Sequence, residues 1–260
     1  HIFVTAYPVP KEGAAKDIMP KERWDAPITP DGGMEQIAWN NAGTKIAYAC
    51  KKMFGKEYAT STNSDIYLYD LASGKTSNIS APNPGYDMDP VFSPDGKSIA
   101  WTSMKTAGFE SDKKRIIIYN FAKPKAEDYS ADFDQSSTNF VWSADGKSLY
   151  FISGVQATYQ LFHLDIAKKK ITQITKGVHD YTELQLAGNK LVGARMSMSM
   201  PTEIYTVDLK TGAQTQLSFV NKDKLDAVTM GKVEERWITS TDGSKLLTWI
   251  IYPPDFDAKK

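Results

Sequence analysis

The sequence predicts an all-β protein, a partial β-propeller with about four full four-stranded blades plus part of another. Three observations favour this fold class. Hairpin signals recur in phase along the 260 residues, and one polar residue closes a strand-like run in each repeat. In addition, no long stretch has apolar residues at the i, i+3, i+4, i+7 spacing of a helix.

Each repeat opens with two apolar runs separated by a turn signal. The pattern occupies residues 37–48, 91–101 and 141–151, with a weaker copy at 184–192. Asp-Gly between two strand-like runs is a strong hairpin signal, because glycine tolerates the positive φ that such turns require. These segments therefore predict the first two strands of each blade.

A further strand-like run follows each hairpin, and its closing polar residue sets the period. These residues are Asp70, Asn120, Asp165 and Asp208, which lie 50, 45 and 43 residues apart. An apolar residue follows nine positions after each of them, at Ile79, Tyr129, Ile174 and Leu217. Four strands repeating every 40 to 50 residues are typical of propeller blades. An ordinary β-sandwich also has short strands, but it does not repeat one strand order in phase.

The period divides the chain into expected domains. Four blades are predicted at 31–80, 81–130, 131–175 and 176–218. Residues 1–30 are interpreted as the remnant of a preceding blade, with strands at 2–7 and 24–28, so the ring is expected to be incomplete. Its open sheet edge would allow self-association, because unpaired edges template strand pairing. Residues 219–260 are interpreted as a connector and a hairpin.

Composition excludes several classes of function. Lys plus Arg and Asp plus Glu are 31 each, so no net charge attracts the chain to nucleic acid or anionic lipid. The longest apolar runs, such as 245–252, are strand-sized, and no membrane partner is expected. Three scattered histidines and one cysteine predict no metal site and no cofactor. Cys50 is expected to be a small buried hydrophobe, and Trp39, Trp101 and Trp142 are expected to pack between blades.

Two segments, 92–101 and 204–212, resemble the WD-type repeats of TolB-like propellers and of prolyl-oligopeptidase-family serine peptidases. Residues 235–256, which contain Tyr-Pro-Pro, resemble the junction at which the peptidase propeller ends and an α/β-hydrolase domain begins. The resemblance is to bacterial dipeptidyl-peptidase V-like and acylaminoacyl-peptidase-like enzymes. It implies a propeller that gates and positions short peptides for that hydrolase domain, in a periplasmic or secreted enzyme, with a cytoplasmic one as the alternative.

The nucleophile elbow of a hydrolase, Gly-x-Ser-x-Gly, is missing from the sequence. None of the 17 glycines begins this pattern, and the nearest segments, 96–100 and 146–150, lack the second glycine. No catalytic residue is therefore predicted in this chain. The resemblance implies a serine-type peptidase for the parent protein, and the chain alone is expected to be inactive.

Four carboxylates are candidate substrate-binding residues because they lead into, or lie in, the first strands of predicted blades, near the mouth of the channel. They are Glu35, Asp87, Asp89 and Glu183. The resemblance implies that Glu35 holds the free amino terminus of a peptide, as propeller-borne carboxylates do in dipeptidyl-cleaving relatives. The alternatives are turn chemistry for Asp87 and Asp89 and a solvated turn for Glu35. The alternative for the whole chain is a stand-alone TolB-like propeller that binds a protein or a carbohydrate.

Overall fold

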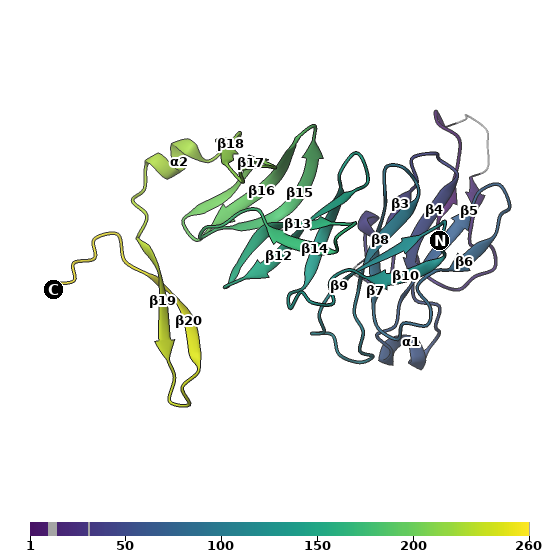
Figure 1. Cartoon of the computed structure of the whole chain (residues 1–260), viewed down its shortest axis with the longest axis horizontal. Helices are drawn as coiled ribbons and strands as arrows, with labels where there is room; N and C mark the ends of the chain where they lie inside the picture. The colour runs from purple at the N-terminus through teal and green to yellow at the C-terminus, as the bar shows by residue number, and fades with distance from the viewer. Residues whose placement is uncertain (10–14, 31, 260) are drawn as a thin grey trace. The chain divides into compact units, whose positions relative to one another are not determined.

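The computed structural model describes residues 1–9, 15–30 and 32–259 and contains four four-stranded sheets (Figure 1). The predicted all-β propeller class, with about four full blades plus part of another, is confirmed. Residue 31, the predicted start of the first blade, lies outside the described residues. The helices in the described residues are short: η1 (Met34–Gln36), α1 (Lys56–Thr60) and α2 (Lys222–Asp226). None of the described helices is long and apolar enough to cross a membrane.

Consecutive strands are neighbours in every four-stranded sheet. The first sheet contains β3 (Ile37–Trp39), β4 (Lys45–Cys50), β5 (Asp65–Asp70) and β6 (Thr76–Asn78). The second contains β7 (Asp87–Phe92), β8 (Ser98–Ser103), β9 (Arg115–Asn120) and β10 (Lys125–Asp128). The third contains β11 (Ser137–Trp142), β12 (Ser148–Val155), β13 (Thr158–Asp165) and β14 (Lys170–Gln173). The fourth contains β15 (Asp180–Ala187), β16 (Lys190–Ser197), β17 (Met200–Asp208) and β18 (Gln214–Gln216).

Two smaller sheets lie nearer the ends of the sequence. One pairs β1 (Phe3–Val4) with β2 (Lys16–Asp17), and the other pairs β19 (Val233–Thr239) with β20 (Lys245–Ile251). The strand predicted at 24–28 is wrong, because that segment is irregular. Pro27 has no N–H to donate to a ladder, and Ala26 instead packs against the first sheet.

The Asp-Gly turns form as predicted and share one hydrogen-bond pattern. Asp95 Oδ1 accepts from the Ser93 hydroxyl at 2.7 Å and from the Lys97 N–H at 3.0 Å. Gly96 has a φ of +68°, the left-handed conformation that glycine adopts without a Cβ clash. The turn at 143–148 repeats these bonds. The turn chemistry therefore fixes the register of the first two strands.

The core follows the alternation of β4. Ile46, Tyr48 and Cys50 pack on one face against the N-terminal segment. Ala47 and Ala49 point to the other face, into a cluster shared with the second sheet. A strand buried on both faces lies in a sheet covered on both sides, as a propeller blade is between its neighbours.

Two of the three tryptophans predicted to pack between blades are buried, Trp101 and Trp142. Trp142 Nε1 also donates to the Val91 carbonyl oxygen in the second sheet at 3.2 Å. The prediction is wrong for Trp39, which is 49% exposed at the end of the short β3. The prediction that Cys50 is buried is confirmed, and burial raises the pKa of its thiol to about 12, so it remains a thiol at neutral pH.

The chain divides into two compact units. The first contains residues 1–149 and 164–171, and the second contains residues 150–163 and 172–260.

Candidate functional site

Glu35 and Asp89 line the same cavity in the first unit. The cavity has a volume of about 530 Å³. Tyr58, Tyr86 and Met88 contribute apolar and aromatic surface to it. Two carboxylates beside aromatic rings can hold a cation and the apolar group attached to it.

Glu35 is held in place by the backbone around η1. Its Oε1 accepts from the Gly33 N–H at 2.7 Å. A Cβ on Gly33 would lie 2.5 Å from Glu35 Oε2, so any other residue there would displace the carboxylate. Gln36, which is buried, anchors η1 because its Oε1 accepts from the Ile28 N–H at 2.8 Å. The exposed Glu35 therefore projects from an anchored turn.

Asp89 lies where β7 departs from regular pairing. The register with β8 shifts between Met88 and Val91, and Asp89 has a φ of +57°. Bulges and left-handed non-glycine residues re-aim side chains and are enriched at functional sites. The Thr102 hydroxyl donates to Asp89 Oδ2 at 3.4 Å. The irregularity thus belongs to a residue that lines the cavity.

Burial and neighbouring charges of both signs act on the Asp89 carboxylate. Burial raises the pKa of Asp89, the Lys114 charge lowers it, and the Glu35 charge raises it by a smaller amount. Within the described part of the chain, neither carboxylate forms an ion pair. A bound ammonium group would favour the ionised form of Asp89 and offset its repulsion from Glu35.

The cationic side chain in the cavity is otherwise engaged. Lys51 Nζ donates to the Ser61 carbonyl oxygen and lies 4.7 Å from the centroid of the Tyr58 ring. Burial also lowers the pKa of Lys51. These contacts hold Tyr58, whose hydroxyl donates to the Thr29 carbonyl oxygen at 3.0 Å.

Asp87 does not lie at an accessible site, which corrects its assignment as a substrate-binding candidate. Its side chain is fully buried. The carboxylate accepts from Trp101 Nε1 at 2.9 Å and from Asn83 Nδ2 at 3.1 Å, and burial raises its pKa to about 6. Asp87 therefore holds the core tryptophan of the second sheet.

Glu183 lies in a different compact unit from the other three candidates. It belongs to the second unit and is exposed on β15, where pairing with β16 shifts register after Tyr181. It is not among the residues that line the cavity of Glu35 and Asp89.

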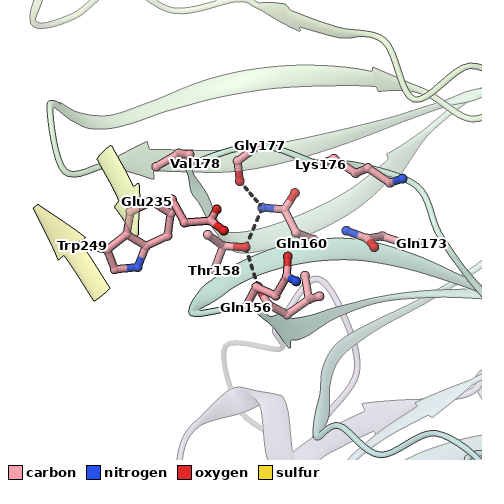
Figure 2. Close-up of a pocket in the computed structure, with 10 residues that line it drawn as sticks. Gln156, Thr158, Gln160, Gln173, Lys176, Gly177, Val178, Glu235 and Trp249 are labelled. Atoms are coloured by element: carbon pink, nitrogen blue, oxygen red, sulfur yellow. Dashed lines mark hydrogen bonds between the residues drawn. The ribbon is translucent and has the colours of Figure 1, made fainter. Parts of the chain in front are cut away.

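A second cavity, of about 390 Å³, lies within the second unit and has a polar lining (Figure 2). Figure 2 shows the Gln160 amide turned toward Gly177 and Thr158. Its Nε2 donates to the Gly177 carbonyl oxygen at 3.0 Å and to the Thr158 hydroxyl at 3.2 Å. Because the Gln160 amide already donates to other groups of this chain, we interpret Gln160 as a structural residue that connects β13 to the segment around Gly177.

Sequence reasoning singled out neither Tyr58 nor Tyr86, although both line the first cavity. Tyr86 adjoins the acidic segment 87–89, and this proximity was the available signal. Tyr58 gave none, because it is brought in by α1 from a separate loop. Among the described residues, no group of three or more His, Cys, Asp or Glu side chains is placed to hold a metal ion.

The repeated four-stranded antiparallel sheets, in which consecutive strands are neighbours, define a propeller-type domain. The chain belongs to the TolB beta propeller domain family, which matches residues 36–247.

Two sequence relatives show which propeller-containing proteins the chain is similar to. The chain is 42% identical over 245 residues to dipeptidyl-peptidase 5 of Porphyromonas gingivalis, covering 94% of this chain and 36% of that protein. It is 40% identical over 260 residues to dipeptidyl-peptidase 5 of Porphyromonas endodontalis, covering all of this chain and 38% of that protein. The chain therefore spans little more than a third of these relatives.

A solved structure shows the same fold. The acylaminoacyl peptidase of Pyrococcus horikoshii aligns with a TM-score of 0.64 at 19% identity, covering 84% of this chain and 32% of that one. The chain is thus a propeller domain related to that of dipeptidyl-peptidase 5.

Proposed function

We propose that this propeller is the non-catalytic domain of a serine dipeptidyl-peptidase, in which it admits short peptides and positions them for an α/β-hydrolase domain. The observation that carries the proposal is the similarity to dipeptidyl-peptidase 5 over nearly the whole chain. No nucleophile elbow occurs in the 260 residues, so the chemistry would belong to the remaining part of such an enzyme.

In this proposal, Glu35 and Asp89 hold the free amino terminus of the peptide. A charge-assisted hydrogen bond between a carboxylate and an ammonium group is about twice as strong as a neutral one. The two carboxylates share one cavity, and their mutual repulsion is offset when an ammonium group binds between them. Fixing the amino terminus sets the distance along the peptide to the bond that is cut.

The cavity walls would receive the first side chains of the peptide. Tyr58, Tyr86 and Met88 offer aromatic and apolar surface within the same 530 Å³. A concave site with apolar walls and a few convergent polar groups is typical of small-ligand sites. We therefore expect peptides with an apolar first residue to bind better than those with an acidic one.

The chain itself can test the site. An alanyl-tyrosine amide with a free amino group is titrated into the protein by calorimetry, beside the same peptide N-acetylated. We expect the free-amino peptide to bind, and Glu35→Gln or Asp89→Asn to weaken it roughly 10- to 100-fold, because a hydrogen bond to a charged group contributes about 1.5–3 kcal/mol.

Glu183→Gln is the matched control, since it removes an exposed carboxylate from the second unit. Equal binding of the acetylated peptide would overturn capture of the amino terminus. Loss of binding in Glu183→Gln, with Glu35→Gln unchanged, would overturn this choice of site.

A further inference from the structure

A cluster of methionines lies in the second unit and includes none of the residues used above. Four of the nine methionines of the chain line one cavity of about 330 Å³. They are Met196, Met198, Met200 and Met230. Core packing alone does not explain this concentration of thioethers, because three of the four side chains are partly exposed to solvent. The exposed fractions are 39% for Met196, 45% for Met198 and 49% for Met230.

The tip of the hairpin between β16 and β17 supplies three of these side chains. Ser197 pairs with Met200 across the hairpin, so residues 198 and 199 form a two-residue turn. Met200 begins β17, Met198 lies in the turn, and Met196 precedes Ser197, the last residue of β16. A tight hairpin holds three sulfur atoms within a few residues of one another, so little chain entropy is lost in bringing them together.

The base of the cluster is fixed by a buried tyrosine. Tyr205 Oη lies 3.7 Å from Met200 Sδ and 3.0 Å from Gln216 Oε1. The Arg195 guanidinium stacks on the Tyr205 ring at 3.6 Å and donates to Gln214 Oε1 at 2.9 Å. Partners behind a ligand orient it, and here they orient the Met200 thioether.

The other residues of the cavity supply no competing hard ligand. Among the described residues that line it, the remaining polar side chains are the hydroxyls of Ser197, Ser199 and Thr202, and there is no carboxylate or imidazole. Hard cations such as Mg²⁺ and Ca²⁺ require carboxylate or carbonyl oxygens, whereas thioethers select Cu(I).

We propose that Met196, Met198 and Met200 form a binding site for a soft monovalent ion, Cu(I), with Met230 as a further thioether. The partial exposure of the side chains lets the ion enter without unfolding the blade. The site uses none of the residues proposed to bind peptide, so either proposal can fail without the other.

Silver(I) serves as the probe, because it is similarly soft and does not change oxidation state under these conditions. The titration uses the whole chain in a Cys50→Ala background, since the Cys50 thiol is a stronger soft ligand. Methyl-labelled methionines report the binding by NMR. We expect one equivalent to bind and to shift the methyl signals of Met196, Met198 and Met200, while that of the buried Met19 stays in place.

The variants Met198→Leu and Met200→Leu separate ligation from packing, because leucine keeps the size and apolarity of methionine. We expect each to weaken Ag(I) binding at least about tenfold, since even the loss of an outer-shell partner costs roughly 10- to 100-fold in metal affinity. Met34→Leu, at an exposed methionine of the first unit, is the matched control.

Three results would overturn the proposal. They are the absence of saturable binding, unchanged affinity in both leucine variants, and shifts confined to methionines outside the cluster. Any of these would leave the cluster as an apolar surface.

Discussion

At the scale of single residues, one hydroxyl recurs in every blade and was not anticipated. It follows the apolar residue that marks each fourth strand and accepts a backbone N–H of the third strand. The four pairs are Ser80 with Ile66, Ser130 with Ile116, Thr175 with Leu161 and Ser218 with Ile204, at 2.8 to 2.9 Å. The hydroxyls lie ten residues after each closing polar residue, so the signal was present in the sequence.

This repeat predicts the cost of removing one hydroxyl. Thr175→Val keeps the shape of the side chain but leaves the buried Leu161 N–H without its acceptor. We expect the free energy of unfolding to fall by about 1–3 kcal/mol, the penalty for an unsatisfied buried polar group, as measured by urea unfolding. Thr215→Val, at an exposed position of β18, is the control, and equal effects in the two variants would contradict the argument.

The buried Asp87 predicts a dependence of stability on pH. Burial raises its pKa from 3.8 to about 6 in the folded state. The folded state therefore holds the proton more tightly than the unfolded state, and stability falls as pH rises from about 4 to about 6. A difference of about 2 pKa units corresponds to about 3 kcal/mol.

The asparagine in Asp87→Asn does not titrate. The free energy of unfolding of this variant, relative to the unsubstituted chain, should therefore rise by about 3 kcal/mol between pH 4 and pH 7. Urea unfolding at both pH values measures the difference. Asp132→Asn, an exposed carboxylate, should show a much smaller change. A pH-independent difference for Asp87→Asn would refute this role of burial.

At the scale of elements, turn chemistry determines where strands pair. The closing polar residue of each third strand caps the following turn. Asp70 Oδ1 accepts from the Ser73 N–H at 2.9 Å, and Asp208 Oδ1 accepts from the Thr211 N–H at 2.9 Å. This local bonding is why the residue recurs with the period of the blade.

Gly96 tests the same principle in the turn before β8. Its φ is +68°, and a Cβ built there would meet no atom within 4 Å. The cost of Gly96→Ala is therefore conformational, about 1–2 kcal/mol. Gly96→Asn should lose less, because asparagine tolerates the left-handed region. Thermal unfolding of the two variants measures the order, and an asparagine variant that is less stable than the alanine one would contradict it.

At the scale of the whole molecule, the matched region of the relatives limits what the chain can do. The match covers 36% and 38% of the two dipeptidyl-peptidase 5 proteins. The sequence of this chain contains no nucleophile elbow. We expect the purified chain not to hydrolyse chromogenic dipeptidyl substrates. Turnover that persists through purification and is abolished by a serine-directed inhibitor would show that this expectation is wrong.

The sequence by itself determined the blade repeat, the hairpins and the burial of Cys50 and Trp101. These features depend on local signals, namely strand alternation, Asp-Gly turns and a capping polar residue, which act within a few residues. It also identified Glu35 and Asp89 as candidates, because both lie near the start of a first strand.

Only the tertiary structure decided which candidates share a site. Asp87 and Asp89 are two residues apart, yet one is fully buried against Trp101 and the other lines the cavity with Glu35. The difference arises from the irregular pairing of β7 and from the packing of the first sheet and η1 against it. Such contacts join residues distant in sequence, and no local pattern records which partners will meet.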